Sequence, residues 1–308
     1  MSAPDLTLAE RVLREACGPR CRTRFPLAPL TTFRIGGPAA IYLEPDSDTD
    51  LKAASHAIRE AGIPFLVLGK GSNVLVSDDG FPGLVIRLGK GYRWAARDGD
   101  VLTAGGAMTL PALAGVALRH ALSGMEFAAA IPASVGGAVR MNAGAHGHEM
   151  AEIVETIDVH RLSTGASEAL TAPEAGFGYR NSGLPADAVV TGTTVRLERG
   201  DPVAIRAAMD EAREWRRRTQ PLAEPNCGSV FTNPSGDHAA RLIDAAGLKG
   251  LAVGGAHVSQ KHANFIVADA GARAADVATL IELIQRRVKE RSGVDLEPEI
   301  RFAGVFGG

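Results

Sequence analysis

Short apolar runs broken by glycine fill the first part of the chain. Residues 41–45 and 64–68 are apolar and typical of strands, and residues 48–61 between them have the spacing of an amphipathic helix. This order predicts a strand–helix–strand unit. Two more strands are expected over 74–76 and 83–88, on either side of a turn that contains an Asp-Gly pair.

Longer periodic segments follow in the rest of the chain. Their spacing predicts helices over 109–122, 202–218, 237–247 and 274–291, and strands over 153–162, 188–198 and 263–268. The uncharged stretch 101–118 contains glycines and a proline, so we interpret it as a turn plus a buried helix and not as a membrane span. The character of the sequence changes near Gly200-Asp201, which predicts a domain boundary there.

Composition narrows the class of protein. The 308 residues include 33 Lys and Arg against 35 Asp and Glu, for a formal charge of -2. A balanced charge argues against a protein that binds nucleic acid or a membrane surface through excess positive charge. Hydrophobic residues make up 45% of the chain, which excludes a disordered protein. The 36 glycines indicate many positions of unusual backbone conformation or close ligand approach.

Three cysteines, Cys17, Cys21 and Cys227, give an odd count, and the N-terminus is charged, with no apolar signal core. We therefore expect a reducing, cytoplasmic location. Cys17 and Cys21 are four residues apart, which would put both thiols on one face of a helix. No second Cys or His pair lies nearby to complete a zinc site, so no metal is expected.

The glycine tract 66–76 begins with an apolar strand, but it is neither a Rossmann fingerprint nor a P-loop. Val74 replaces the third glycine of the Rossmann pattern, and the residues that follow are β-branched and not helical. Two interpretations remain open. The backbone N–H groups, with Ser72 and Asn73, form a concave nest for a phosphate or pyrophosphate, or the segment is a tight hairpin-like turn.

A second tract, residues 131–147, carries almost only small side chains, and Ser134 is placed to cap a helix. Small side chains let a flat ligand lie against the backbone. A large heteroaromatic cofactor fits this pattern. Close packing of a helix on a sheet would require the same residues, so this alternative also stays open.

Ordered motifs over about residues 30–302 carry a family resemblance. They are Thr31–Pro38, Leu68–Val76, Gly124–Phe127, Ile131–Ala138, Met141–Ala145, Phe177–Ser182, Gln220-Pro221, Gly228–Phe231, Asn233-Pro234, Lys261–Phe265 and Leu296–Arg301. In these motifs the chain resembles the UDP-N-acetylenolpyruvoylglucosamine reductase family. The resemblance implies an α+β fold, with a vanillyl-alcohol-oxidase (PCMH-type) FAD-binding region in residues 1–200, chiefly about 30–198. A smaller α+β substrate-binding domain would follow over 201–308.

The resemblance also implies an activity, namely reduction of UDP-N-acetylglucosamine enolpyruvate to UDP-N-acetylmuramate for peptidoglycan synthesis. NADPH would be the co-substrate of bound FAD, with hydride passing from flavin N5 to C3 and a proton from Ser229 to C2. Arg180 would stabilise the charge that builds at the substrate carboxylate, and Glu299 would donate a hydrogen bond or position a water. The small-molecule substrate would be the only partner of a monomer, without nucleic acid or membrane.

Further site residues follow from the matching motifs. Those expected to bind the cofactor are Gly69, Lys70, Gly71, Ser72, Asn73, Val74, Ile131, Pro132, Ser134, Val135, Gly136, Gly137, Asn142, Ala143 and Gly144. Those expected to bind the substrate are Arg218, Gln220, Asn233, Lys261 and His262.

The chain departs from the family pattern in places. No tyrosine lies between Arg180 and Ser229, so the chain resembles the shorter-loop (type II) subgroup, which lacks the tyrosine-bearing insertion. Thr232 and Ala133 stand where many relatives have lysine and glycine. The alternatives are another FAD oxidase or dehydrogenase of the same fold, and a nucleotide-binding module without turnover. Cys227 near Ser229 also leaves a thiol nucleophile open.

Overall fold

The computed structural model describes residues 4–307, which form two compact units. Unit 1 consists of residues 4–24, 40–70 and 83–214, and unit 2 of residues 25–39, 71–82 and 215–307. Two segments of the N-terminal half therefore belong to the unit that holds the C-terminus. The boundary expected near residue 200 stays a prediction for the functional domains.

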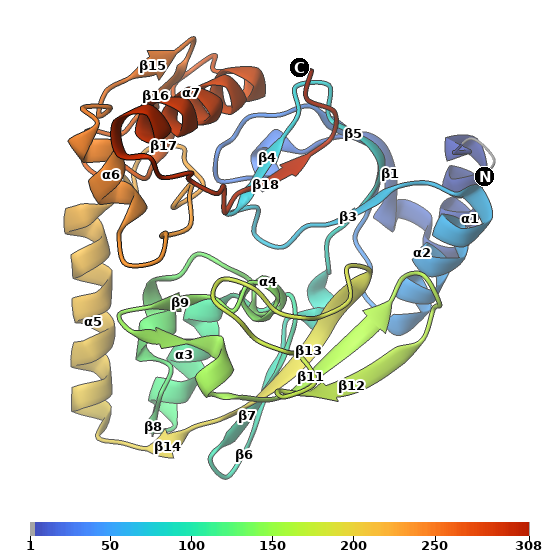
Figure 1. Cartoon of the computed structure of the whole chain (residues 1–308). Coiled ribbons are helices and arrows are strands. Elements are labelled where there is room, and N and C mark those ends of the chain that lie inside the picture. The colour runs from blue at the N-terminus through green and yellow to red at the C-terminus, as the bar shows by residue number, and fades with distance from the viewer. Residues whose placement is uncertain (1–3, 308) are drawn as a thin grey trace. The chain divides into compact units, whose positions relative to one another are not determined.

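The described part of unit 1 carries two larger sheets, of four and five strands, and two small two-stranded sheets (Figure 1). Its helices and strands are α1 (Leu6–Cys17), α2 (Asp48–Ala61), β3 (Phe65–Val67), β6 (Ala95–Asp98), β7 (Val101–Gly105), α3 (Leu110–Arg119), β8 (Leu122–Ser123), α4 (Val135–Arg140), β9 (Gly144–Ala145), β10 (His148–Glu149), β11 (Val154–Arg161), β12 (Ser167–Thr171), β13 (Ala188–Arg196) and β14 (Glu198–Arg199), together with most of β1 (Cys21–Pro26), β2 (Pro38–Leu43), β5 (Phe81–Ile86) and α5 (Pro202–Thr219). The two small sheets are β10-β9 and β14-β8.

The first sheet has the strand order β1-β2-β5-β3, and β3 runs parallel to β5. Helix α2 begins where the Ser47 hydroxyl accepts from the Asp50 N–H at 3.3 Å, and it ends at Gly62 in the left-handed conformation. This confirms the helix predicted over 48–61. Its apolar face packs with α1 into a core with Leu13, Ile41 and other side chains. Strand β5 lies between β2 and β3, so the strand–helix–strand unit is split.

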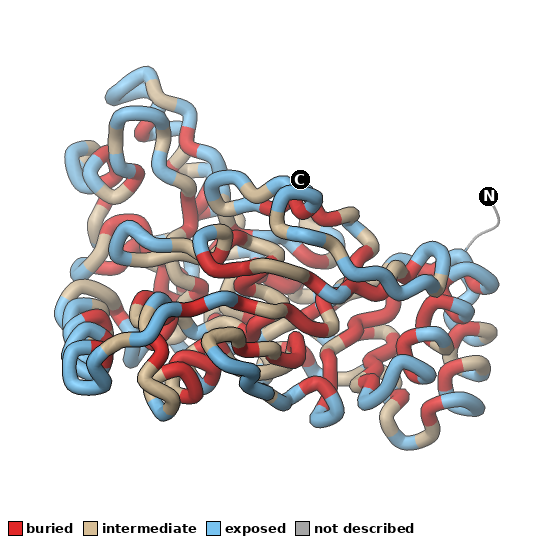
Figure 2. Tube along the Cα trace, turned by 90° about the horizontal axis from the view of Figure 1, so that it is seen from below, coloured by how far each residue is buried: buried red, intermediate tan, exposed pale blue. Residues whose placement is uncertain are grey.

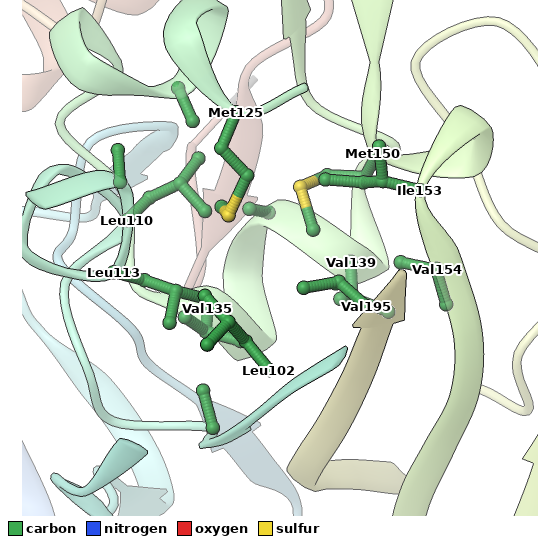
Figure 3. Close-up of a cluster of buried hydrophobic side chains, with 14 of the residues drawn as sticks. Leu102, Leu110, Leu113, Met125, Val135, Val139, Met150, Ile153, Val154 and Val195 are labelled. Carbon is green, nitrogen blue, oxygen red and sulfur yellow. The ribbon is translucent and has the colours of Figure 1, made fainter. Parts of the chain in front are cut away.

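The second sheet, β12-β11-β13-β7-β6, is antiparallel throughout. Helices α3 and α4 contribute to the same buried cluster as its strands, so the two helices remove the apolar side chains of the sheet from water. Met125 and Met150 point into this cluster, whose other labelled side chains come from both helices and from β7, β11 and β13 (Figure 3). Flexible methionine side chains fill irregular gaps in such cores.

Unit 2 contains β4 (Val74–Val76), α6 (Ala239–Ala245), β15 (Ala252–Val253), β16 (Ala256–Val258), β17 (Ile266–Ala268), α7 (Ala274–Ser292) and β18 (Arg301–Ala303). Helix α7 buries Val277, Leu280 and Ile281 and ends at Gly293, as its spacing predicted. Strand β4 pairs in parallel with β18. The Asp78 carboxylate also accepts from the first N–H groups of α7, at 2.8 and 3.0 Å, which ties residues 71–82 to this unit.

Four sequence expectations need correction. Residues 101–105 form strand β7 and not a turn, because they complete a hairpin with β6. Strands β3 and β4 lie in different sheets, so the tract between them is not a hairpin turn. Cys17 ends α1 whereas Cys21 opens β1, so the two buried thiols share no helical face. Only residues 266–268 of the strand expected over 263–268 are extended, and the residues before them form a loop.

Burial follows the periodicity of the elements. Near the N-terminus, buried and exposed stretches alternate along the helical coils, as expected for helices that cover a core on one side (Figure 2). In β13, six of the nine residues are buried and two more are half-buried, in keeping with a central strand covered by α4. No helix among residues 4–307 is long and apolar enough to cross a membrane.

Candidate flavin pocket and proton-transfer site

A cavity of about 570 Å³ lies within unit 1. Its lining comes from β3, from the residues that follow β3 and β5, from the β7–α3 connection, from α4 and from β13. Strands β3 and β5 are parallel neighbours, so Gly69 and Arg87 follow their carboxyl ends at the same edge of the sheet. Ligands bind preferentially at such edges. The volume is in the range of small-molecule and cofactor pockets, roughly 300–1,000 Å³.

Close backbone contacts shape this cavity. A Cβ atom on Gly69 would lie 2.5 Å from the Ser134 hydroxyl oxygen, and one on Gly106 would lie 2.1 Å from the Val190 carbonyl oxygen. Both distances are far shorter than real contacts, so only glycine fits at these positions. The glycine loop after β3 is therefore held directly against the start of α4, and main-chain groups are left to face a ligand.

The charge of the lining is positive. Lys70, Arg87, Arg93 and Arg140 line the cavity, and its described lining residues include no aspartate or glutamate. Arg87 donates from Nε to the Gly69 carbonyl oxygen at 3.3 Å, which orients the glycine loop. Cationic and small residues together fit a dinucleotide, whose pyrophosphate is anionic and whose rings are flat.

Ser134 caps helix α4, as predicted. Its hydroxyl accepts from the Gly137 N–H at 3.2 Å. Of the residues expected to bind the cofactor, the cavity is lined by Gly69, Lys70, Ser134, Gly136 and Gly137. Ile131, Pro132, Val135, Asn142, Ala143 and Gly144 lie in unit 1 outside this lining, and Gly71, Ser72, Asn73 and Val74 lie in unit 2. Their cofactor roles stay predictions.

Sequence reasoning missed three of the four cationic residues, namely Arg87, Arg93 and Arg140, although Arg140 lies inside the small-residue tract 131–147. Arg87 directly follows the buried run of β5, so a lone positive charge after an apolar strand was the available signal. Arg93 has no comparable signal, because it lies in the irregular segment after the short helical turn Lys90–Tyr92.

Ser229 and Glu299 lie on adjacent segments of unit 2. The Val230 carbonyl oxygen accepts from the Glu299 N–H at 2.8 Å, and Phe231 and Pro298 form a bridge one step further on. The buried Asn264 side chain holds Phe231 from the other side, donating to its carbonyl at 2.8 Å and accepting from its N–H at 3.0 Å. The segment that carries the serine is thus fixed on both sides.

The glycine tract 66–76 is also hydrogen-bonded to the segment that carries Glu299. Asn73 donates from its side chain to the Glu299 carbonyl oxygen at 3.1 Å, and its own carbonyl accepts from the Arg301 N–H at 3.1 Å. Cys227 is fully buried, and burial together with the nearby Glu299 carboxylate raises the pKa of its thiol. A thiol with a raised pKa stays protonated at neutral pH, which argues against Cys227 as a nucleophile.

The residues expected to bind substrate all lie in unit 2. The Lys261 ammonium donates to the Arg217 carbonyl at 2.5 Å, and the Asn233 side chain accepts from the Ala239 N–H at 3.1 Å, where it caps α6. His262 packs edge-on against Phe265, and burial lowers the pKa of its imidazole. The substrate-binding roles of these residues stay predictions.

Arg218, the arginine singled out in the sequence, is exposed in the last turn of α5. Arg216 is half-buried, and it donates to the Gln220 side-chain oxygen at 2.6 Å. Burial lowers the pKa of its guanidinium. Arg216 is a half-buried cation next to Gln220, a predicted substrate ligand, which makes it a stronger candidate than Arg218; residue spacing did not reveal this.

Comparison with known proteins agrees with these features. A profile described as "FAD binding domain" matches residues 39–170, and one described as "UDP-N-acetylenolpyruvoylglucosamine reductase, C-terminal domain" matches residues 220–303. A UDP-N-acetylenolpyruvoylglucosamine reductase of Heliobacterium modesticaldum is 46% identical over 92% of this chain and 90% of that protein. One from Myxococcus xanthus is 46% identical over 91% of each chain.

Solved structures agree with the sequence matches. The crystal structure of UDP-N-acetylenolpyruvylglucosamine reductase from Thermus caldophilus superposes with a TM-score of 0.81 at 40% identity, covering 92% of this chain and 99% of that chain. Phl p 4.0202, a glucose dehydrogenase, superposes at 0.50 with 14% identity over 70% of this chain and 51% of its own, which shows a shared fold alone. With its cation-lined cavity and both matching domains, the chain belongs to the UDP-N-acetylenolpyruvoylglucosamine reductase family.

Proposed function

We propose that NADPH supplies the hydride, and Ser229 the proton, when this chain reduces UDP-N-acetylglucosamine enolpyruvate. As a member of its family, the chain is an FAD-dependent oxidoreductase of peptidoglycan precursor synthesis. Bound FAD would supply the hydride chemistry that links the nicotinamide to C3 of the enolpyruvyl group. The chain's own residues bind the substrate, stabilise the charge that develops on it and deliver a proton to C2.

Arg180 is proposed to bind the substrate carboxylate. Its guanidinium is always charged and its planar fork matches a carboxylate, so it stabilises the negative charge that spreads from C2 into that group. The Arg180 guanidinium also lies 5.2 Å from the centre of the Tyr179 ring. This contact limits the conformations that the long side chain adopts before substrate arrives.

Ser229 is proposed to protonate C2, with Glu299 as its neighbour. The observation that supports this assignment is the backbone connection through Val230, which keeps the serine and the glutamate on adjacent fixed segments. A serine hydroxyl is a weak acid, so its proton must be replaced through a relay. The Glu299 carboxyl group, on the adjacent segment, is suited to hold the water or proton that this relay requires.

Replacing Ser229 by alanine tests the assignment. Reduction of the flavin by NADPH should be unchanged, while reoxidation by the enolpyruvyl substrate should slow by about 10²–10⁴-fold, the usual contribution of a positioned proton donor. Stopped-flow absorbance under anaerobic conditions measures the two half-reactions separately. The Ser292→Ala variant is the matched control, because its hydroxyl donates to the Val288 carbonyl on α7 at 2.8 Å and has no proposed role. Equal slowing of both half-reactions in Ser229→Ala would rule out the donor role.

We further propose that the protein acts in the cytoplasm as a monomer. The cysteines Cys17, Cys21 and Cys227 are free and buried, which suits a reducing compartment. Light scattering of the purified protein measures its oligomeric state directly.

A further inference from the structure

Arg180 lies at the tip of a tight turn in unit 1. Gly178 and Asn181 exchange both backbone hydrogen bonds, at 3.0 and 3.1 Å, so Tyr179 and Arg180 alone form the tip. Arg180 has φ of +54°, in the left-handed region that favours glycine. A side chain there is sterically disfavoured. Such backbone strain is typical of functional positions and persists only where the surroundings hold it.

Asn142 anchors one leg of this turn. Its side chain is fully buried, donates to the Gly178 carbonyl at 3.0 Å and accepts from the Ala151 N–H at 2.9 Å. Asn142 itself has φ of +41°, which asparagine tolerates better than most residues. The amide therefore spans from the end of α4 to the residue directly before the tip.

Ser182 anchors the other leg. Its buried hydroxyl donates to the Arg140 carbonyl oxygen at 2.9 Å, at the end of α4. The Arg140 guanidinium then donates to the carbonyls of Leu184 and Pro185, each at 2.9 Å, and to that of Ala188. The chain on both sides of the turn is thus hydrogen-bonded either to Arg140, the last residue of α4, or to Asn142, two residues after it.

The opposite end of α4 forms part of the cavity. Ser134, Gly136 and Gly137 line it, while the helix itself is only six residues long. One short segment, residues 134–140, therefore lines the proposed flavin pocket and is hydrogen-bonded to the Arg180 turn at its end.

We propose that Asn142 and Ser182 are positioning residues that hold the Arg180 turn in the conformation that binds the substrate carboxylate. The proposal rests on the role proposed above for Arg180. The Arg180 side chain loses much conformational freedom when it binds the substrate carboxylate. A backbone that is already fixed lowers the entropy cost of this binding, because only the side chain remains to be ordered. A loosened turn would leave the side chain intact but displace its guanidinium, and small displacements are costly at reacting centres.

Two variants remove one tether each. Ser182→Ala deletes the hydroxyl that binds Arg140. Asn142→Asp keeps the shape of the side chain and the acceptor for Ala151, but it places a carboxylate oxygen against the Gly178 carbonyl. Calorimetry should show affinity for the enolpyruvyl substrate reduced by about 10- to 100-fold. In Ser182→Ala, affinity for UDP-N-acetylglucosamine, which lacks the carboxylate, should be unchanged, as should flavin content and reduction by NADPH. Asn142 is also an expected cofactor ligand, so substrate affinity of Asn142→Asp is compared at equal flavin content.

The matched control is Ser55→Ala. Ser55 is also a buried serine of unit 1 with one side-chain hydrogen bond, at 2.9 Å to His160. We expect a lower melting temperature and unchanged binding of both ligands, which separates loss of stability from loss of positioning. If Asn142→Asp does not fold, Ser182→Ala carries the test by itself.

A double-mutant cycle with Arg180→Ala separates the two proposals. If the tethers act through Arg180, Ser182→Ala has little further effect on carboxylate binding in the Arg180→Ala background. Fully additive effects, or tether variants that bind both ligands like the wild type while Arg180→Ala does not, would overturn the positioning role and leave the role of Arg180 standing. If Arg180→Ala binds the enolpyruvyl substrate normally, the proposed function of Arg180 is wrong, and the positioning role fails with it.

Discussion

Asparagine side chains, buried at Asn142 and Asn264 and half-buried at Asn226, stabilise loops at the candidate sites of both units. The Asn264 side-chain amide accepts from the Phe231 N–H and donates to the Phe231 carbonyl, the two hydrogen bonds that a neighbouring strand would make. Asn226 accepts from the Gly228 N–H at 2.9 Å and donates to the Pro221 and Glu224 carbonyls. The backbone of a loop has no neighbouring strand to pair with, and an unpaired buried polar group costs about 1–3 kcal/mol of stability. Asparagine amides that hydrogen-bond this backbone therefore stabilise irregular segments near reacting groups.

His160 provides a test of stability against pH. Its ring is fully buried between the hydroxyls of Ser55 and Ser167, at 2.9 and 3.0 Å, and burial lowers its pKa below the usual 6.5. The unfolded chain therefore binds the proton first as pH falls through 6.5. Unfolding free energy should be constant above that pH and should drop below it, with a slope of up to about 1.4 kcal/mol per pH unit.

Denaturant unfolding of the wild type and His160→Asn between pH 8 and about pH 5 measures this effect. The stability advantage of the wild type over the variant should shrink as pH falls. His56→Asn, an exposed histidine on the same helix α2 as Ser55, is the control and should parallel the wild type. An advantage that does not change with pH would show that His160 is not buried in its neutral form.

Helix α4 is stable only because its ends are fixed. Six residues are far too few for an isolated helix, so the Ser134 cap and the packing against β13 must hold it. The same serine hydroxyl would lie 2.5 Å from a Cβ atom on Gly69, so the cap of the helix leaves no room for a side chain in the glycine loop. A change on either side of this contact should therefore affect both the helix and the pocket.

Gly69→Ala should lower both flavin content and the free energy of unfolding, by roughly 1–3 kcal/mol, because its Cβ would overlap the Ser134 hydroxyl. Ser134→Ala should cost about 1 kcal/mol through the lost cap. In the double variant the nearest atom is the Ser134 Cβ, at 3.7 Å, which is an ordinary contact. The double variant should then be no less stable than Ser134→Ala alone.

Gly115→Ala on α3 is the control, since its Cβ would meet nothing closer than an Arg119 side-chain nitrogen at 3.8 Å. Alanine should stabilise this helix by roughly 0.5–1 kcal/mol and leave flavin content unchanged. Strictly additive effects of Gly69→Ala and Ser134→Ala would contradict the shared contact.

Helices whose apolar residues repeat regularly over several turns were predictable from the sequence. The helices α2 and α7 lie where the spacing and the terminal glycines placed them, because their apolar faces repeat over several turns. The hairpin β6–β7 was missed, because Val101–Gly105 is short, small and apolar, and fits a buried helix equally well. Helix α1, outside the predicted elements, packs against α2 through Leu13 and its neighbours.

Long-range pairing was not predictable. Strand β4 pairs with β18, more than 200 residues later in the chain, and no local pattern indicates such a partner. For the same reason the assignment of residues 71–82 to unit 2 was not expected. At the candidate sites, the glycine tracts and Ser134 were found from residue type. The roles of Arg180, Ser229 and Glu299 came only from the family resemblance, since each alone is an ordinary polar residue.

At the scale of the whole molecule, the account requires one chain to pass electrons from a nicotinamide to an enolpyruvyl ether through a bound flavin. The cavity in unit 1 fits the flavin, and the fixed Ser229 segment in unit 2 fits proton delivery. A nucleotide-binding module would bind FAD without turnover, and an oxidase of the same fold would take electrons from an alcohol instead.

The most direct test is anaerobic single turnover. The FAD-loaded protein is first reduced with NADPH and then mixed with UDP-N-acetylglucosamine enolpyruvate, or with UDP-N-acetylglucosamine as the control, while flavin absorbance is followed. The account predicts rapid reduction, followed by reoxidation with the enolpyruvyl compound alone and formation of UDP-N-acetylmuramate. Reduced flavin that persists in the presence of the enolpyruvyl compound, or oxidised flavin that is reduced by sugar alcohols without NADPH, would contradict it.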